Sequence, residues 1–201
     1  MNPWRHLQLI FRYHKQRWIT RILSHRVQYR HPTLVSHPTV IWDYGYEHLD
    51  AISLGADVVV QAYAEIVVHK HSPFSAVEGR LTLGDRVFIG TGANLRAAGG
   101  AISVGAGSAI SQHSVVVAAN HNIGAGRPYL YSPWDDTRTG VIIGANVWIG
   151  AGCVLLPGTN IGDNAVIAAG AVVNMSVPTG ELWGGIPARR LKSLPATERT
   201  S

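Results

Sequence analysis

The chain repeats a pattern of six residues, in which an aliphatic residue is followed by a small residue and then by residues typical of turns. The clearest run places its aliphatic residues in steps of six, at Ile143, Ile149, Leu155, Ile161, Ile167 and Val173. Two shorter runs precede it, at Leu83, Ile89 and Leu95 and at Val104, Ile110 and Val116. A unit of six residues is too short for a helix with its own core, but it suits a short strand followed by a corner.

Three such units are expected to close one triangular coil, and successive coils to stack as parallel strands about 4.7–4.9 Å apart. One aliphatic side chain per unit points inward, so the stack contains continuous columns of Ile, Leu and Val. Glycine, Asn and Asp stand at the corners, where tight turning or positive φ is needed. The period therefore predicts an all-β fold, a parallel β-helix over roughly residues 50 to 178.

The composition agrees with a single globular unit. The chain has 201 residues, of which 46% are hydrophobic and only 14% are charged, and it contains 22 glycines. These values exclude a disordered chain and a charge-rich helical bundle. No run reaches the roughly 18 apolar residues of a membrane span, and the N-terminus lacks the apolar stretch of a secretory leader, so we expect a cytoplasmic protein.

Cys153 is the only cysteine, which excludes an intrachain disulfide. It stands at the small-residue position of its repeat unit, where Ala165 and Ala171 stand in later units. The pattern therefore predicts a buried packing role rather than nucleophilic catalysis.

Residues 1–31 carry seven arginines and lysines and no acidic residue, whereas the whole chain has a formal net charge of +5. The positive charge thus belongs to this segment, and nucleic-acid binding is not indicated. Trp4, Leu7, Phe11, Trp18 and Ile22 recur at helical spacing, which predicts an amphipathic helix that ends before Pro32. The helix could cover the open end of the β-helix or contact a membrane surface, and we favour the covering role.

These observations divide the chain into three expected segments: a basic helical segment over 1–40, a β-helix catalytic domain over 41–178, and a C-terminal cap or tail over 179–201. Both ends of a β-helix expose unpaired strand edges. The segment from Pro187 to Pro195 is the natural cover for the second end.

The six-residue phase breaks between Val116 and Ile143, and residues 122–140 fit no repeat unit. We expect an extruded loop there. Its two Tyr, one Trp, two Asp and two Arg are a recognition composition, unlike the Gly and Ser of a flexible linker. The break therefore predicts a ligand site at the base of the loop, beside His121.

Three stretches, 143–152, 156–173 and 184–192, resemble the hexapeptide-repeat acyltransferases. His121 at the base of the loop and the closing Gly-Ile-Pro-Ala-Arg resemble one branch, the maltose, galactoside, nodulation-factor, exopolysaccharide and xenobiotic O-acetyltransferases. The resemblance implies a left-handed β-helix, a homotrimer, and acetyl transfer from acetyl-CoA at active sites between subunits.

By the same resemblance, His121 is the general base that deprotonates the acceptor hydroxyl, with no acyl-enzyme. An imidazole with an ordinary pKa of about 6.5 can accept a proton at neutral pH. Small residues beside the pantetheine arm, a tryptophan near the ligands and cations near the CoA phosphates correspond here to Trp148, Ala151, Ala169, Arg189 and Lys192.

The expected acceptor is a sugar or a polysaccharide precursor. Pyranose stacking and hydroxyl recognition are assigned to residues in and beside the loop: Asn120, Tyr129, Tyr131, Trp134 and Asp135. The galactoside-type enzymes have a carboxylate upstream of the histidine, whereas this chain reads Ala97-Ala98-Gly99-Gly100 there. Either Asp43, Glu65 or Glu78 fills that role from the first coils, or the acceptor is held differently.

Three other functions were weighed. Zinc carbonic anhydrases share the solenoid, and their histidines resemble a pair five residues apart with a third well upstream. Here His69 and His71 are two residues apart and His113 and His121 are eight apart, so no metal site is predicted. Acetyl transfer to the amine of an amino sugar would use the same CoA-side motifs. A non-catalytic assembly module would need neither His121 nor an aromatic loop.

Overall fold

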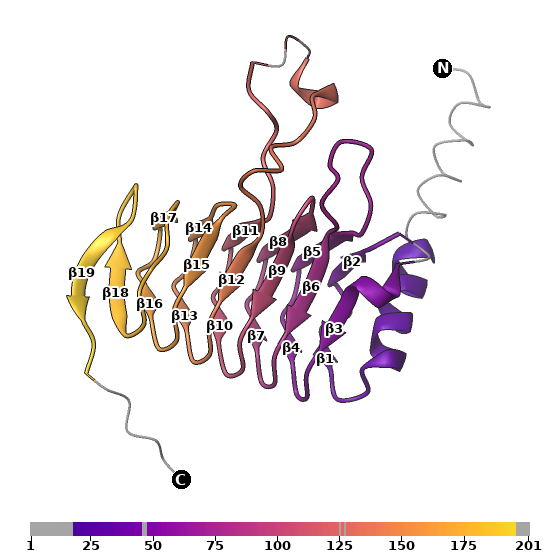
Figure 1. Ribbon diagram of the computed structural model, residues 1–201. Coiled ribbons are helices and arrows are strands. Elements are labelled where there is room, and N and C mark those ends of the chain that lie inside the picture. Colours follow the sequence, from indigo (N-terminus) through magenta and orange to yellow (C-terminus); the bar gives the residue numbers. More distant parts are fainter. Residues whose placement is uncertain (1–17, 46–47, 125, 127, 196–201) are drawn as a thin grey trace, which may run out of the picture.

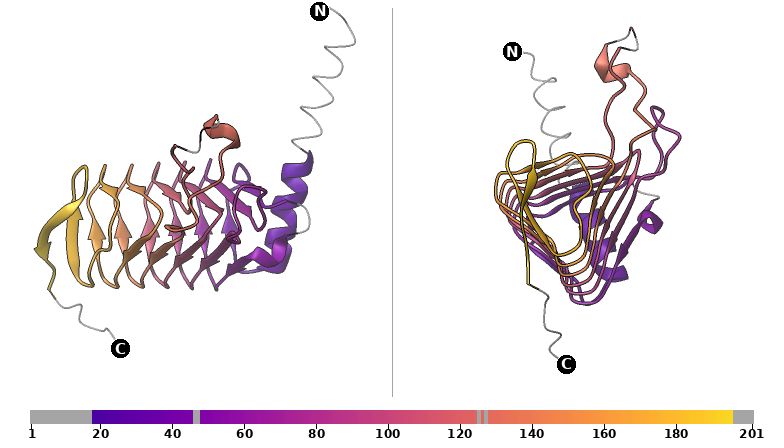
Figure 2. Two further views of the ribbon diagram at one scale, coloured as in Figure 1. Left: turned by 45° about the horizontal axis from the view of Figure 1, so that its top comes forward. Right: turned by 60° about the vertical axis from the view of Figure 1, so that its left-hand side comes forward.

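The computed structural model describes residues 18–45, 48–124, 126 and 128–195. Its strands form a triangular prism of three sheets; Figure 1 shows the prism from the side, and the right-hand view of Figure 2 shows its triangular outline. From β1 to β15 each turn of the chain contributes one strand to each sheet, so successive strands in a sheet come from successive coils. All strand pairs are parallel except the last one, β18 with β19.

The first face, sheet A, contains β1 (Val35–Ser36), β4 (Val59–Val60), β7 (Phe88–Ile89), β10 (Ala109–Ile110), β13 (Trp148–Ile149), β16 (Val166–Ile167), β18 (Glu181–Gly184) and β19 (Arg189–Ser193). Sheet B contains β2 (Ile41–Asp43), β5 (Glu65–His69), β8 (Asn94–Ala98), β11 (Val115–Val117), β14 (Val154–Leu155) and β17 (Val172–Val173). Sheet C contains β3 (Ile52–Leu54), β6 (Arg80–Leu83), β9 (Ala101–Val104), β12 (Val141–Ile143) and β15 (Thr159–Ile161).

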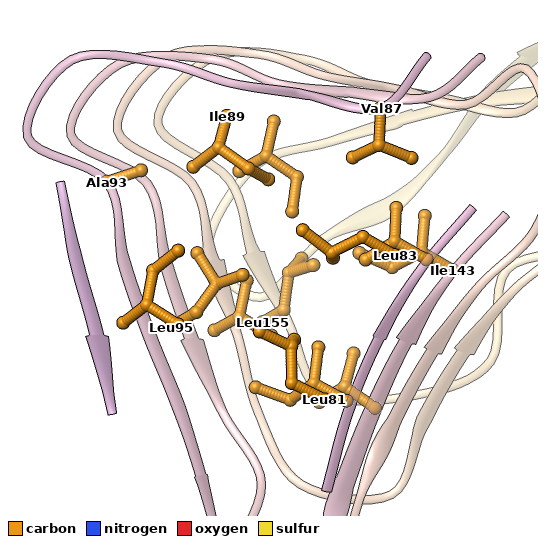
Figure 3. Packing of buried hydrophobic residues seen from close by; sticks show 14 of the residues in the cluster. Leu81, Leu83, Val87, Ile89, Ala93, Leu95, Ile143 and Leu155 are labelled. Carbon is orange, nitrogen blue, oxygen red and sulfur yellow. The ribbon is translucent and has the colours of Figure 1, made fainter. Parts of the chain in front are cut away.

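The predicted β-helix is confirmed, and the aliphatic residues of the six-residue period form its core. Ile149, Leu155 and Ile161 lie on successive sheets, and each side chain is fully buried. Figure 3 shows the corresponding side chains of several coils, including Leu83, Ile89 and Leu95, converging in the interior. Each such side chain contributes roughly 1.5–3 kcal/mol by burial.

The corners also follow the prediction. Asp57, Asn146 and Asn164 adopt positive φ values of 56°, 54° and 58°. Stacked corners hold one another through hydrogen bonds, as between the side chains of Asn146 and Asn164 at 2.8 Å. Short polar side chains tolerate this left-handed conformation better than most residues, which explains their place in the repeat.

Helical residues 18–30 cover one end of the prism. Leu23 and Val27 are buried in the core, and the hydroxyl of Tyr44 donates to the carbonyl of Leu23 at 3.2 Å. The helix ends before Pro32, as predicted, but Trp18 is 67% exposed and does not belong to the apolar face. The earlier part of the expected helix lies outside the described residues.

No helix in the described part of the chain is long and apolar enough to cross a membrane. The coils begin at β1, before the start expected from the period near residue 50. At the far end, β18 and β19 form an antiparallel hairpin, with Trp183 and Ala188 buried beneath it. The segment expected to cover this end is therefore part of the hairpin.

Three excursions leave the prism at the corner between sheets B and C. The first contains the 3₁₀ helix η1 (Leu49–Ala51), the second spans 70–79, and the third spans 118–140 with η2 (Tyr129–Tyr131). Figure 1 shows the second and third projecting from the same edge. The extruded loop over 122–140 is thus confirmed, whereas the excursion over 70–79 was not predicted.

Candidate active site

A cavity of about 490 Å³ lies on the outer face of sheet B, at the edge that carries the excursions. Its floor comes from β5, β8 and β11, and its wall comes from the extruded loop. The lining residues are Val67, His69, Arg96, Ala98, Val117, Ala119, Asn120, His121 and Trp134. Three of the sequence-predicted site residues therefore share one cavity, namely Asn120, His121 and Trp134.

The strand register explains the floor. Val67 pairs with Arg96, which pairs with Val117 on the next coil, and His69 pairs with Ala98. Alternate residues of a strand point to opposite faces, so the inward neighbours of these residues fill the core while these residues point outward. His69 and Arg96 line the cavity but are not among the site residues predicted from the sequence.

Trp134 stands directly above the short turn between β8 and β9. A Cβ atom on Gly99 would lie 2.2 Å from Cε3 of the indole, so only glycine leaves room for the ring there. Residues 97–100 lack the expected carboxylate. The indole of Trp134 packs against Gly99 in this stretch. The amide of Trp134 also donates to the carbonyl of Phe74 at 2.7 Å, and the two rings stack with centroids 6.3 Å apart.

The second and third excursions are fastened together. The carboxylate of Asp136 accepts hydrogen bonds from the Ser75 hydroxyl at 2.6 Å and from the Ala76 amide at 2.9 Å. These contacts fix the base of the loop against the excursion over 70–79. The tip is different, because Tyr129 and Tyr131 in η2 are 63% and 62% exposed and do not line the cavity.

His121 lies on a short antiparallel ladder at the base of the loop. It bridges Trp134, and its exposed ring meets the indole edge to face with centroids 6.1 Å apart. The amide of Asp135 donates to the carbonyl of Asn120 at 2.8 Å and the amide of Asn122 donates to that of Pro133 at 2.8 Å. The backbone that carries His121 is therefore held on both sides.

Asp135 faces its own turn. Its Oδ1 atom accepts hydrogen bonds from the hydroxyl and the amide of Thr137 at 2.5 Å and 3.0 Å. These bonds hold the pKa of the carboxyl below its usual range. Asp135 does not line the cavity, so its predicted role toward a sugar hydroxyl stays a prediction.

None of the three candidate replacements for the missing carboxylate lines the cavity. Both Asp43 and Glu65 lie beside the cavity on the outer face of sheet B: Oδ2 of Asp43 is 3.6 Å from Nε2 of His69, and Oε2 of Glu65 is 3.7 Å from Nη1 of Arg96. Glu78 pairs with Arg80 outside the cavity, and this hydrogen bond lowers the pKa of its carboxyl. The cavity thus presents an imidazole and a guanidinium where carboxylates were considered.

The residues assigned to CoA lie elsewhere on the prism. Trp148 is on the outer face of sheet A, and its indole donates to the Ser111 hydroxyl at 3.1 Å. Ala151 and Ala169 occupy the same corner between sheets A and B in successive coils. The other two, Arg189 and Lys192, are exposed on β19. None of the five lines the cavity with His121.

Cys153 is fully buried, and its Sγ lies 3.1 Å from the carbonyl oxygen of Ala168. The predicted packing role is confirmed. Burial disfavours the thiolate and raises the pKa of the thiol above its usual value.

We therefore expect the native chain to show no thiol titre with a disulfide reagent such as DTNB at about pH 8, because the reactive thiolate is not formed or reached. Unfolding in denaturant should release one thiol per chain. A prompt titre in the native state would contradict the buried placement of Cys153.

Within the residues that the structure describes, no group of three or more His, Cys, Asp and Glu side chains is arranged to hold a metal ion. His69 and His121 line one cavity, but a zinc centre with an open position takes three protein ligands.

Comparisons with known proteins place these features in context. Residues 140–174 match the family model described as bacterial transferase hexapeptide, six repeats. The chain is 35% identical over 136 residues to gamma carbonic anhydrase 1, mitochondrial, of Arabidopsis thaliana, covering 63% of this chain and 49% of that protein. It is 43% identical over 54 residues to galactoside O-acetyltransferase of Escherichia coli, covering 27% of each.

Among solved structures, a mutant of AntD, an N-acyltransferase from Bacillus cereus, in complex with dTDP and coenzyme A has a TM-score of 0.66 at 20% identity. The match covers 85% of this chain and 89% of that chain, and it shows a shared fold. The chain spans about half the length of the first curated relatives it matches. Residues 140–174 thus carry the hexapeptide-repeat pattern of bacterial transferases, and the chain is similar over part of its length to an acetyltransferase and to gamma carbonic anhydrases of that kind.

Proposed function

We propose that the chain is an acetyl-CoA-dependent O-acetyltransferase of a sugar or polysaccharide precursor, with His121 as the general base. The observation that carries the proposal is the placement of His121. It stands at the wall of a cavity, held by an isolated β-bridge to Trp134, whose indole lines the same cavity. The galactoside O-acetyltransferase among the relatives supports this choice of acceptor.

The chemistry is a direct transfer. The acceptor oxygen forms a bond to the thioester carbonyl carbon while its proton moves to the His121 imidazole, and the carbon–sulfur bond then breaks. The proton held by His121 passes to the leaving thiolate, which departs as CoA. No residue is acylated, in agreement with the burial of Cys153, the only cysteine.

Transfer to an amine is the nearest alternative, because an amino sugar would use the same base and the same donor. An N-acyltransferase is among the solved structures that share the fold. Matched acceptors that differ only in a hydroxyl or an amine at one carbon separate the two reactions.

The test is acceptor-dependent release of CoA from acetyl-CoA, followed with a thiol reagent over sugars, amino sugars and oligosaccharides. We expect release with at least one hydroxyl acceptor, and mass spectrometry of the product should show one added acetyl group. Failure of the chain to bind acetyl-CoA would reject the proposal in favour of a non-catalytic assembly module.

We also propose that the active unit is a homotrimer, since one chain does not complete the site. The CoA candidates and His121 lie on different faces, so a neighbouring copy would supply one of the two sets. An apolar row runs along the outer face of sheet A, matched residue by residue through the strand register: Val35, Val59, Phe88, Ala109, Trp148, Val166 and Leu182. Phe88 and Trp148 in this row are 39% and 58% exposed. Such a row fits an interface between copies.

Light scattering on the wild-type chain should give the mass of three chains. Phe88→Glu should give smaller species, because an unpaired carboxylate in an apolar interface costs about 1–3 kcal/mol or more. Thr82→Glu, which places the same charge on the outer face of sheet C, serves as the control. A single-chain mass for the wild type would contradict the proposal.

A zinc-dependent hydratase of the gamma carbonic anhydrase kind is the second candidate. His69 and His121 in one cavity and the identity to the Arabidopsis relative favour it. The described residues supply two of the three ligands that zinc requires, so a partner chain would have to supply the third. Zinc retained through purification, together with CO₂ hydration, would select this candidate.

A further inference from the structure

We propose that the acceptor is an anionic glycan, whose phosphate or carboxylate is bound by Arg96 and His69 while its reacting hydroxyl meets His121. The inference deepens the proposed function, since it names the class of acceptor for the same cavity. It rests on the kinds of polar groups that the cavity presents and on the place of the nearby carboxylates.

The polar groups that line the cavity are a guanidinium, two imidazoles, an amide and an indole. A guanidinium donates hydrogen bonds in a planar fork that matches phosphate and carboxylate oxygens. No Asp or Glu is among the lining residues of this cavity. A site built for a neutral sugar usually offers acceptors as well as donors to the sugar hydroxyls, and this floor offers mainly donors.

The indole of Trp134 adds a donor. Its Nε1 atom is buried and has no hydrogen-bond partner within the part of the chain that the structure describes. A buried donor without an acceptor is costly, and a ligand oxygen would become its partner only after a shift of the ring. The preference for an anion therefore rests on Arg96 and His69, with Trp134 as part of the cavity wall.

The nearest carboxylates lie beside the lining groups, on the same outer face of sheet B. Glu65 reaches Arg96 at 3.7 Å and also accepts from the Asn94 side-chain amide at 2.5 Å, and Asp43 reaches His69 at 3.6 Å. The Arg96 and Glu65 side chains are 48% and 39% exposed, so solvent screens their attraction and leaves the guanidinium free to bind a second anion. Arg96 therefore carries a permanent positive charge at the floor of the cavity.

The test compares matched neutral and anionic glycans: glucose against glucose 1-phosphate for the phosphate arm, and glucose against glucuronate for the carboxylate arm. Binding is measured by saturation-transfer NMR without acetyl-CoA, and turnover by CoA release with it. We expect the anionic member of at least one pair to bind about tenfold more tightly than the neutral member. The preference should weaken as ionic strength rises from about 0.05 M to about 0.5 M.

Arg96→Gln should abolish the preference. Arg80→Gln should keep it, because Arg80 is equally exposed, is likewise paired with a glutamate, and does not line the cavity. Glu65→Gln should strengthen it, since the competing charge beside Arg96 is removed. A purely structural role for the Arg96–Glu65 pair predicts the opposite result for Glu65→Gln, so this variant decides the question even if Arg96→Gln fails to fold.

Equal binding of neutral and anionic members, or a preference that survives in Arg96→Gln, would overturn the inference. The outcome for the proposed function is read separately. Charge-dependent binding without CoA release would support the anion site and reject the transferase, whereas CoA release with neutral glycans at full rate would support the transferase and reject the anion site.

Discussion

Replacing His121 with alanine is expected to lower kcat by about 10²- to 10⁴-fold, the usual contribution of a positioned general base. The affinity for acetyl-CoA should stay unchanged, because none of the residues assigned to CoA lines the cavity with His121. His121→Gln should show a similar loss, since its amide can form hydrogen bonds but cannot accept the acceptor proton. Single-turnover CoA release at saturating acceptor measures the effect on the chemical step.

His71→Ala is the matched control. His71 is also an exposed histidine near this edge of the prism, but it does not line the cavity, so its loss should leave kcat within about twofold. The cavity holds a second imidazole, that of His69, and the two histidines must be compared directly. If His69→Gln lost kcat while His121→Ala retained it, the base would be His69, supported by Asp43.

The β-helix is predictable from sequence because each of its units is local. Ile149, Leu155 and Ile161 are spaced by one side of the triangle, so a short window of sequence contains the information that places each of them on its sheet. The same holds for corner residues such as Asn146 and Asn164, whose positive φ is a property of the residue and its turn. Where coils are regular, stacked residues are 18 positions apart, as in this pair.

The excursions break this local rule, which is why the site was only partly predictable. Glu65 stacks on Asn94 across 29 residues, and Ser108 meets Val147 across 39. The longer excursion is visible because residues 122–140 interrupt a clear phase. The excursion over 70–79 falls among the less regular first coils. The strand register that places His69 and Arg96 beside His121 therefore could not be derived from the six-residue spacing.

Other parts depend on contacts that no single segment encodes. Gly99 and Trp134 are far apart in sequence. Only the structure shows that the stretch 97–100, which lacks the expected carboxylate, packs against the indole of Trp134. Trp18 fits a helical stripe, yet the helix turns Leu23 and Val27 toward the core instead.

Replacing Gly99 with alanine is expected to destabilise the fold and to weaken acceptor binding together. The new Cβ would lie 2.2 Å from Cε3 of Trp134, so the ring must leave its seat, and overpacking of this kind costs about 1–3 kcal/mol. Gly99 also has a φ of +62°, which adds about 1–2 kcal/mol for any residue with a side chain. Urea unfolding gives the first effect, and the acceptor KM, expected to rise more than kcat falls, gives the second.

Gly107→Ala separates the two costs, because Gly107 has a similar φ of +69° but nothing within 4 Å of an added Cβ. It should show the backbone cost alone and normal acceptor binding. Most of the excess cost at Gly99 should disappear in a double variant that also carries Trp134→Ala, since the methyl group then has no ring to displace and meets only Cβ of Ala119, at 3.1 Å. If Gly99→Ala and Gly107→Ala cost the same in the presence of Trp134, the indole does not rest on Gly99, and the cavity wall would have to be assigned to another part of the loop.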